Sequence, residues 1–222
     1  MNEIFKVRPI AVMQPLPGTG IPDGEDLIAY CARVSNPDNQ EEFDTAEKLL
    51  AYCRRNAHWS VFEMGEAIVE VEVPRDISRQ VIRHRSFNFQ EFSQRYSDQF
   101  TFTVRDVRRE HPTNRQSSVD DFSDRDKAEF AEDCRSMALI AQDMYDKWRS
   151  RGAAKECARV FLPEGLTMSR FYMKGNMRNW FHYLSVRDGN GTQLEHQKLA
   201  KAIRECLMPH YASVILGGAE DG

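Results

Sequence analysis

The sequence predicts a single α+β domain that is rich in helix and contains a small antiparallel sheet. Residues 67–73 alternate valine with glutamate, which is typical of a strand with one buried face. Several other segments repeat apolar residues at helical spacing. The chain has 222 residues, of which 41% are hydrophobic, enough for one core and little for two. We therefore expect one domain that spans residues 1–222.

The first half of the chain follows these two periodicities. Leu49, Leu50 and Cys53 fall on one helix face, whereas Val69, Val71 and Val73 share one side of a strand. Pro74 ends that strand because it has no backbone N–H to donate. The expected elements are a strand at 4–13, a turn at 15–24, helices at 25–34 and 42–56, a strand at 67–73, a short helix at 75–84 and a strand at 94–104 with Phe100 and Phe102 on one face.

The second half is predicted to be mostly helical. Residues 105–121 are charged and aperiodic, as in a surface loop. Ser123 is a favourable N-cap for a long helix that ends at Gly152. The expected buried side of this helix carries Phe130, Met137, Ile140, Met144 and Trp148. The remaining expected elements are a short helix at 155–161, a strand at 167–173, a helix at 177–186, a loop at 188–191 and a helix at 192–216.

Composition excludes several classes of protein. A net charge of −4 argues against binding to bulk nucleic acid, although a local arginine cluster still permits a small anionic substrate. The five cysteines are widely spaced without a CxxC pair, so neither a disulfide framework nor a zinc ribbon is expected. The start of the chain does not resemble a signal peptide, and no apolar run approaches the roughly 20 residues that span a bilayer. We expect a cytoplasmic protein without a membrane partner.

Arginines are concentrated between residues 75 and 95. In a helix, Arg75, Arg79 and Arg83 stack at i, i+4 and i+8, which costs a few tenths of a kcal/mol per pair. The planar guanidinium fork matches phosphate oxygens, so the cluster suggests an anion site. The alternative is that the arginines favour the negative end of the helix dipole and reach water. Interleaved phenylalanines either wall a flat ring or belong to the core.

Other candidate groups are weaker. Basic and aromatic residues mix between 159 and 187, which is also typical of a solvated helix face. His58 follows a helix and suits a C-terminal cap, and Ser60 with Glu63 has the spacing of a capping box. No Walker A, GxGxxG, HExxH or GxSxG motif occurs, and no metal is predicted. The chemistry must therefore come from a bound cofactor or from the arginine site itself.

One segment resembles the signature of a known family. Arg83-His84-Arg85, followed after seven residues by Ser93, is similar to the motif of the flavin-dependent thymidylate synthases, and Glu91 and Arg95 agree with it. Further similar segments follow the family's order at 32–35, 58–63, 156–163 and 176–187. Together they cover residues 30–197, and a chance match to all of them is not credible.

The resemblance implies an enzyme that methylates dUMP at C5 to give dTMP. It implies FAD as cofactor, NADPH as reductant and methylenetetrahydrofolate as one-carbon donor, without a cysteine nucleophile. It also implies a homotetramer whose active sites form where subunits meet. Two alternatives remain: a related methylase or hydroxymethylase that acts on UMP, or on both UMP and dUMP, and a non-catalytic RNA-binding module, which the acidic charge disfavours.

The resemblance also assigns residues. Arg187 is expected to stabilise negative charge as N3 of the uracil ionises, and His58 to support catalysis beside the flavin. Position 182 is histidine where some members of the family have asparagine. The residues expected to contact FAD are Ser60, Arg83, His84, Arg85, Glu91, Asn176, Met177, Arg178 and His182. Those expected to contact dUMP are Gln80, Arg83, Glu91, Phe92, Ser93, Gln94, Arg95, Arg159 and Arg187.

Overall fold

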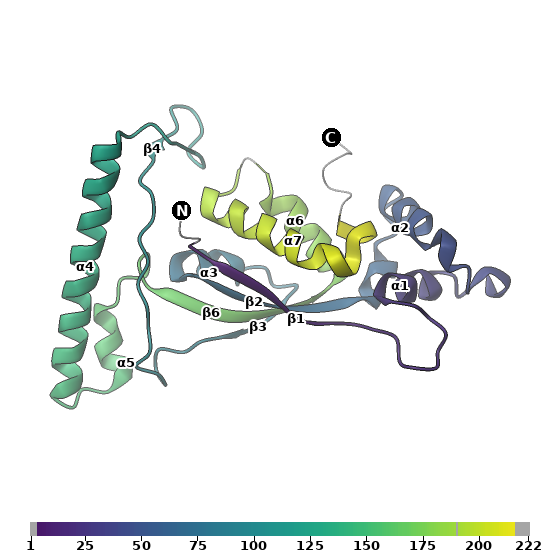
Figure 1. The fold of residues 1–222 in the computed structure, drawn as a ribbon, viewed down its shortest axis with the longest axis horizontal. Helices are drawn as coiled ribbons and strands as arrows, with labels where there is room; N and C mark the ends of the chain where they lie inside the picture. Colours follow the sequence, from purple (N-terminus) through teal and green to yellow (C-terminus); the bar gives the residue numbers. More distant parts are fainter. Residues whose placement is uncertain (1–3, 190, 216–222) are drawn as a thin grey trace.

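A four-stranded antiparallel sheet organises the computed structural model, which describes residues 4–189 and 191–215 (Figure 1). Helices α6 and α7 lie along one face of this sheet (Figure 1). The strand order is β1 (Lys6–Val12), β2 (Glu66–Pro74), β6 (Met168–Asn176) and β3 (Asn88–Glu91). The predicted α+β class with a small antiparallel sheet is confirmed.

Strand β2 lies between β1 and β6 and forms the centre of the core. Val69, Val71 and Val73 are fully buried, as their alternation predicts. Val69 faces Met173 and Val71 faces Phe171 in the register with β6, so both strands turn the same kind of side chain to the core. Burying one such side chain contributes about 1.5–3 kcal/mol. The sheet is therefore held by one continuous apolar face.

Two C-terminal helices cover that face: α6 (Met177–Arg187) and α7 (Leu194–Ile215). Helix α6 begins at Asn176, whose side chain accepts the N–H of Asn179 at 3.0 Å. Trp180 is fully buried and donates its indole N–H to the carbonyl of Gly175 at 3.0 Å. The cap and this bond connect the end of β6 directly to the start of α6.

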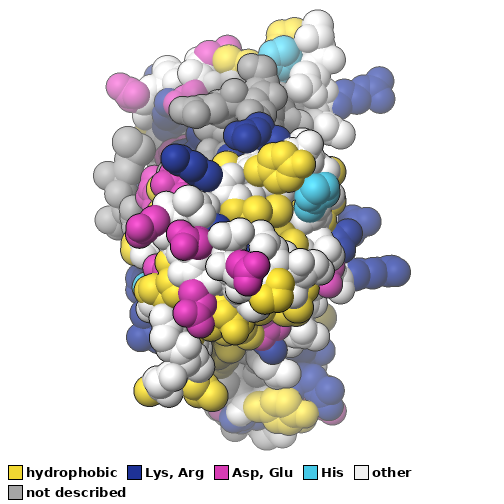
Figure 2. Space-filling view, turned by 90° about the vertical axis from the view of Figure 1, so that its right-hand side faces the viewer, with side chains coloured by type: hydrophobic (Ala, Val, Ile, Leu, Met, Phe, Trp, Pro, Cys, Tyr) yellow, Lys and Arg dark blue, Asp and Glu magenta, His cyan; other side chains and the backbone are white. Residues whose placement is uncertain are grey.

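Two N-terminal helices, α1 (Gly24–Ala32) and α2 (Ala46–Arg55), form one end of the molecule (Figure 1). Leu50 and Cys53 of α2 are buried, as predicted. Acidic and apolar side chains are interspersed on this end (Figure 2). Short 3-10 helices occur at η1 (Pro37–Asn39), η2 (Phe43–Thr45) and η3 (Trp59–Met64).

The prediction of a strand at 94–104 is wrong. Its aromatic side chains stack instead of joining the sheet: Phe100 meets Phe102 and Tyr145 edge to face at centroid distances of 5.5 and 4.8 Å. An isolated bridge from Phe102 to Thr167, with the N–H of Met168 donating to the carbonyl of Thr101 at 2.9 Å, brings this segment only to the start of β6. The predicted loop at 105–121 also contains a two-stranded hairpin of β4 (Arg109–Glu110) and β5 (Ser118–Val119).

The long helix α4 (Asp124–Ser150) is capped as predicted but not packed as predicted. Ser123 accepts the N–H of Asp126 at 3.2 Å. The five apolar side chains expected on its buried side are between 38% and 55% exposed, whereas Ala141 and Tyr145 are buried. Helix α4 stands beyond one end of the sheet, next to the short helices α5 (Lys155–Ala158) and η4 (Arg159–Phe161) (Figure 1). In the described chain its apolar stripe therefore lacks a covering layer.

Replacing Gly175 by alanine is expected to destabilise the fold by about 1–3 kcal/mol through overpacking. A Cβ at this position would lie 2.5 Å from two ring carbons of the buried Phe87. Thermal unfolding measures the effect.

Gly189→Ala is the matched control, because its nearest neighbour is the carbonyl oxygen of Val186 at 3.8 Å. We expect a change within about 0.5 kcal/mol. Equal melting temperatures for both variants would show that the Phe87 ring gives way to the added methyl group.

Candidate active site

Helix α3 (Arg75–Val81) brings two of the clustered arginines to one cavity. Ile77 and Val81 are fully buried and attach the helix to the core. Arg75 and Arg79, one turn apart, therefore line the same cavity. Arg83 lies beyond the end of the helix and is exposed, so the predicted row of three arginines is divided.

We name this cavity of about 420 Å³ the arginine pocket. Its walls come from α3, from the α5–η4 segment and from the two loops beside them. The residues that line it are Arg75, Arg79, Gln94, Glu156, Arg159, Val160, Leu162 and Glu164. Of the residues predicted to contact the substrate, Gln94 and Arg159 thus meet in one place.

Two buried donors in the arginine pocket have no partner among the described residues: Nη1 of Arg75 and Nε2 of Gln94. Burial, and then the charge of Arg79, lowers the pKa of Arg75 below its ordinary value. An arginine nevertheless stays charged at neutral pH. A buried polar group without a partner costs about 1–3 kcal/mol, and an anion towards which these two side chains turn would relieve the cost.

The carboxylate of Glu91 is fully engaged within the chain. The hydroxyls of Ser78 and Ser169 each lie 2.9 Å from its Oε1, and Nη1 of Arg79 lies 3.1 Å from its Oε2. Arg79 also contacts Glu164 at 3.2 Å. Glu91 therefore joins β3, α3 and β6, which leaves Arg75 and Arg159 as the arginines of the pocket without an ion pair among the described residues.

A second set of predicted residues gathers where η3, the end of α3 and helix α6 meet. Nε of Arg187 donates to Nε2 of His84 at 2.8 Å. Burial, and then the charge of Arg187, lowers the pKa of His84 to about 4. The ring is therefore neutral at pH 7, its Nε2 accepts, and its proton lies on Nδ1. This arrangement holds Arg187 through Nε and leaves its two terminal nitrogens available.

Two further contacts join the elements of this second set. Arg178 of α6 pairs with Glu63 of η3, which rules out the predicted capping-box role of Glu63. The side chain of Asn179 donates to the carbonyl of Ser86 at 2.7 Å. The exposed predicted residues on this surface are His58, Ser60, Arg83, Arg85, Arg178 and His182.

The remaining predicted residues lie elsewhere or inside the fold. Met177 is fully buried, and Asn176 serves as the N-cap of α6. Phe92 lines a separate cavity of about 540 Å³ beside Arg170. Ser93 accepts the N–H of Arg95, whose guanidinium lies 3.6 Å from Glu156 of the arginine pocket. Gln80 bonds to Gln193 at 2.7 Å.

Sequence reasoning missed the importance of Arg75 and Arg79. Both stood in the arginine cluster, but neither was assigned to a ligand. Their positions one helical turn apart were the available signal, whereas the unpartnered donor of Arg75 is visible only in three dimensions. Within residues 4–189 and 191–215, no group of three or more histidine, cysteine, aspartate or glutamate side chains is arranged to hold a metal ion. None of the described helices is both long and apolar enough to cross a membrane.

Fold and site together define an α+β protein with a basic, partly buried pocket, and comparison with known proteins supplies its family. Residues 19–211 match the family model described as thymidylate synthase complementing protein. The flavin-dependent thymidylate synthase of Synechocystis sp. is 44% identical over 190 residues, which are 86% of this chain and 87% of the relative. The chain therefore belongs to the flavin-dependent thymidylate synthase family and is a methyltransferase.

Other similar proteins agree with this assignment. A probable flavin-dependent thymidylate synthase of Paramecium bursaria Chlorella virus 1 is 42% identical over 206 residues, covering 92% of this chain and 94% of the relative. The structure of a UMP/dUMP methylase, PolB from Streptomyces cacaoi, bound with 5-Br dUMP, superposes with a TM-score of 0.80. It covers 96% of this chain and 93% of its own, at 22% identity, and supports the fold alone.

Proposed function

We propose that this enzyme methylates dUMP at C5 to give dTMP, with FAD, NADPH and methylenetetrahydrofolate. The observation that carries the proposal is the pair of unpartnered buried donors, on Arg75 and Gln94, beside Arg159 in the arginine pocket. A nucleotide monophosphate carries two negative charges and several acceptor oxygens, which is the chemistry that these donors lack. The names of the similar proteins supply the pyrimidine and the flavin.

The arginine pocket holds the phosphate in this proposal. Gln94 and Arg159, which the family resemblance assigns to dUMP, donate to this phosphate, and Arg75 adds a third donor. Arg95, whose backbone N–H bonds to Ser93, reaches the pocket through its ion pair with Glu156. Glu91 and Phe92, also assigned to the nucleotide, act less directly. Glu91 holds Arg79, Ser78 and Ser169 in place. Phe92 lines the separate cavity beside Arg170.

The second set of residues fits a flavin dinucleotide. Arg83 and Arg85 are exposed and form no ion pair among the described residues, so both guanidinium groups are available to a pyrophosphate. Ser60, Arg178 and His182 add polar groups on the same surface, and Asn176, Met177 and His84 lie next to it in the chain. The resemblance also assigns Glu91 to FAD, although its carboxylate bonds to Ser78, Ser169 and Arg79 on the side of the arginine pocket. When bound, the flavin supplies the hydride that NADPH delivers. His58 has a supporting role beside it.

Arg187 supplies the electrostatic step of the proposal. Its permanent cation, held by His84, stabilises the negative charge that develops when N3 of the uracil ionises. C5 thereby becomes nucleophilic without a cysteine. The family resemblance also assigns Gln80 of α3 and the exposed Arg83 to the nucleotide.

We further propose a homotetramer in the cytoplasm, with each active site shared between subunits. Arg75 of the arginine pocket is the first residue of α3, whereas the flavin residues Arg83 and Arg85 follow its last residue, Val81, about 9 Å further along the helix axis. The exposed apolar stripe of α4 offers a subunit interface. A second copy of the chain would bury that stripe and supply the other half of each active site.

The double substitution of Met137 and Met144 by glutamate is expected to split the tetramer and to release the flavin. Both side chains lie on the exposed stripe of α4, and charges there cannot be buried in an interface without a large cost. Light scattering measures the mass, and the visible flavin absorbance of the gel-filtered protein measures retention.

Ala128→Glu is the control, because Ala128 is exposed on the opposite side of α4. It should leave both mass and flavin content unchanged. A double variant that remains a tetramer would contradict the role of the stripe.

The activity is tested with purified protein and C5-tritiated dUMP. We expect a yellow protein that releases tritium only when both NADPH and methylenetetrahydrofolate are present. Parallel turnover of UMP and dUMP separates the proposed substrate from the ribonucleotide alternative. A protein that stays colourless after incubation with FAD would disprove the proposal, and salt-sensitive RNA binding without NADPH oxidation would favour a binding module.

A further inference from the structure

Gln80 lies within a chain of hydrogen bonds that leads away from the proposed nucleotide site. Its Nε2 donates to Oε1 of Gln193 at 2.7 Å, and its Oε1 lies 3.3 Å from Nδ1 of His196. Nε2 of His196 lies 3.0 Å from the hydroxyl of Tyr183. At the other end, Nε2 of Gln193 donates to Oε2 of Glu195 at 2.9 Å. The chain thus connects side chains of α3, α6 and the start of α7.

The direction of every bond follows from the carboxylate at one end. An ionised glutamate only accepts, so Gln193 must turn its amino group to Glu195 and its carbonyl oxygen to Gln80. Gln80 then presents its amino group to Gln193 and its oxygen to His196. Nδ1 of His196 must carry the proton, so the bare Nε2 accepts from Tyr183. All donors point towards Glu195.

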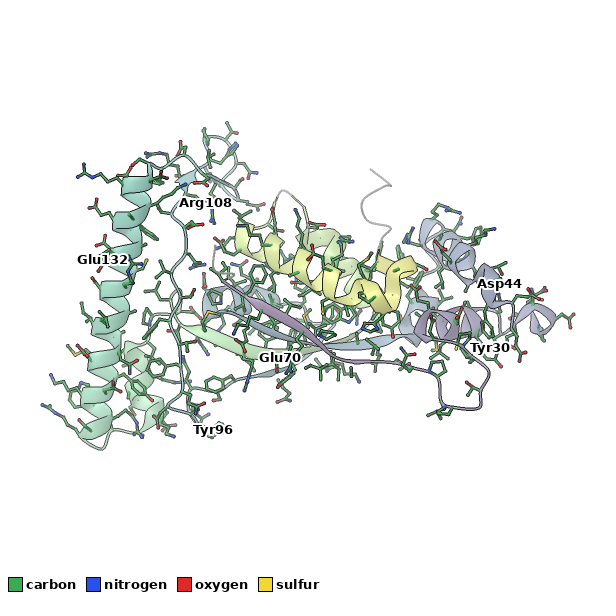
Figure 3. The ribbon with its side chains drawn as sticks, in the orientation of Figure 1. Tyr30, Asp44, Glu70, Tyr96, Arg108 and Glu132 are labelled. Atoms are coloured by element: carbon green, nitrogen blue, oxygen red, sulfur yellow. The ribbon has the colours of Figure 1, made fainter. Side chains whose placement is uncertain are left out.

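The carboxylate that sets this direction is itself well anchored. Glu195 is 3% exposed and forms an ion pair with Arg108, whose side chain is also mostly buried. Arg108, labelled in Figure 3, comes from the segment that leads to β4. Although burial raises the pKa of Glu195, the hydrogen bond from Arg108 holds it below its ordinary value. Burial, and then the charge of Arg187, lowers the pKa of His196 to about 3, so its ring stays neutral.

We propose that Glu195 and Gln193 are positioning residues that fix which end of the Gln80 amide faces the nucleotide. Gln80 is only partly buried, and its amide keeps one free N–H and one free lone pair for a ligand. A reversed amide would present its amino group where the nucleotide requires an acceptor, and its oxygen where the nucleotide requires a donor. The inference rests on the proposed function, because it takes the ligand of Gln80 to be the nucleotide.

Glu195→Gln is the first test, because it preserves shape and reverses the chain. Arg108 requires an acceptor, so the new amide at position 195 would turn its oxygen to Arg108 and its amino group to Gln193. Gln193 and Gln80 would then both rotate, and the proton of His196 would move from Nδ1 to Nε2. We expect the Kd of dUMP to rise about tenfold, because the nucleotide would lose a hydrogen bond to Gln80 and would face a group of the wrong hydrogen-bonding kind there.

The double variant Gln193→Glu with Glu195→Gln separates the effect of hydrogen-bond direction from the effect of losing the ion pair between Arg108 and Glu195. The carboxylate at position 193 still accepts from Gln80, so the original orientation of its amide returns. The contact between Arg108 and a carboxylate does not return. We expect the Kd of dUMP to recover to within about threefold of the original enzyme, which is about 0.65 kcal/mol.

Nitrogen NMR of histidine-labelled protein gives a readout that needs no turnover. The proton of His196 should lie on Nδ1 in the original enzyme and in the double variant, but on Nε2 in Glu195→Gln. Glu25→Gln is the control: Glu25 accepts from Ser213 and Val214 near the other end of α7. It should lower the melting temperature without changing the tautomer or the Kd.

Two results would overturn the inference. One is an unchanged Kd and tautomer in Glu195→Gln; the other is a double variant as impaired as the single one. If Glu195→Gln does not fold, the double variant alone tests the inference, which requires that this variant folds and binds dUMP nearly as tightly as the original enzyme. If the original enzyme binds no dUMP, the proposed function fails, while the tautomers still test the direction of the chain.

Discussion

Replacing Arg187 by alanine is expected to lower kcat by about 10²–10³-fold, the range seen when one charge-stabilising group is removed from a site. In the structure Arg187 is held through Nε by the neutral ring of His84, and its two terminal nitrogens bond to no other side chain among the described residues. Its cation is therefore fixed before any charge develops on the uracil. Because Arg187 is assigned to that charge and not to the cofactor, the variant should keep its flavin. Steady-state kinetics and the visible spectrum measure both quantities.

Arg187→Lys tests whether charge alone suffices. Lysine retains the cation but lacks the Nε that donates to His84, so we expect activity between those of alanine and arginine. Loss of Arg187 should also raise the pKa of His84 above about 4, because one of the charges that lowers it is gone. A kcat that stays unchanged in Arg187→Ala would refute the role in ionisation.

Arg159→Ala is expected to raise the Kd of dUMP by about 10–100-fold, the equivalent of a hydrogen bond to a charged group. Arg159 lines the arginine pocket, and no ion pair within the described chain competes for it. Removing it leaves Arg75 and Gln94 to hold the phosphate alone. Calorimetry with dUMP measures the change.

Deoxyuridine, which lacks the phosphate, separates this effect from general damage to the site. Its affinity should be the same in Arg159→Ala and in the original enzyme. Arg8→Ala is the matched arginine control, since Arg8 pairs with Glu70 on strand β2 at 3.0 Å. Equal losses for nucleotide and nucleoside would place the phosphate outside the arginine pocket.

Local patterns predicted most of the elements because those elements have one buried face. The alternation in β2 and the spacing in α2 each identified side chains that are in fact buried. The same reasoning failed at 94–104, where the period of two was present but Phe100 packs on Tyr145 and Phe102 packs on Phe100. It also failed on α4, whose apolar stripe is real but lacks a partner within the described chain.

The site was predictable to a similar extent. The motif at 83–95 and its companions led to the family, and Gln94 and Arg159 do meet in one pocket. Patterns did not reveal that Arg79 is occupied by Glu91 and Glu164, or that Arg75 has a donor without a partner. Those facts depend on side chains brought together from segments far apart in the chain.

By itself the sequence determined the fold class, the family and the supply of arginines, because periodicity and motif order are properties of neighbouring residues. Tertiary structure alone decided which arginines remain available to a ligand and which way the amide of Gln80 points. The physical reason is that charge pairing and hydrogen-bond direction depend on contacts such as Arg79 with Glu91 and Gln193 with Glu195. The first of these joins a helix to a strand, and the second continues to Gln80, which lies 113 positions from Gln193 in the chain.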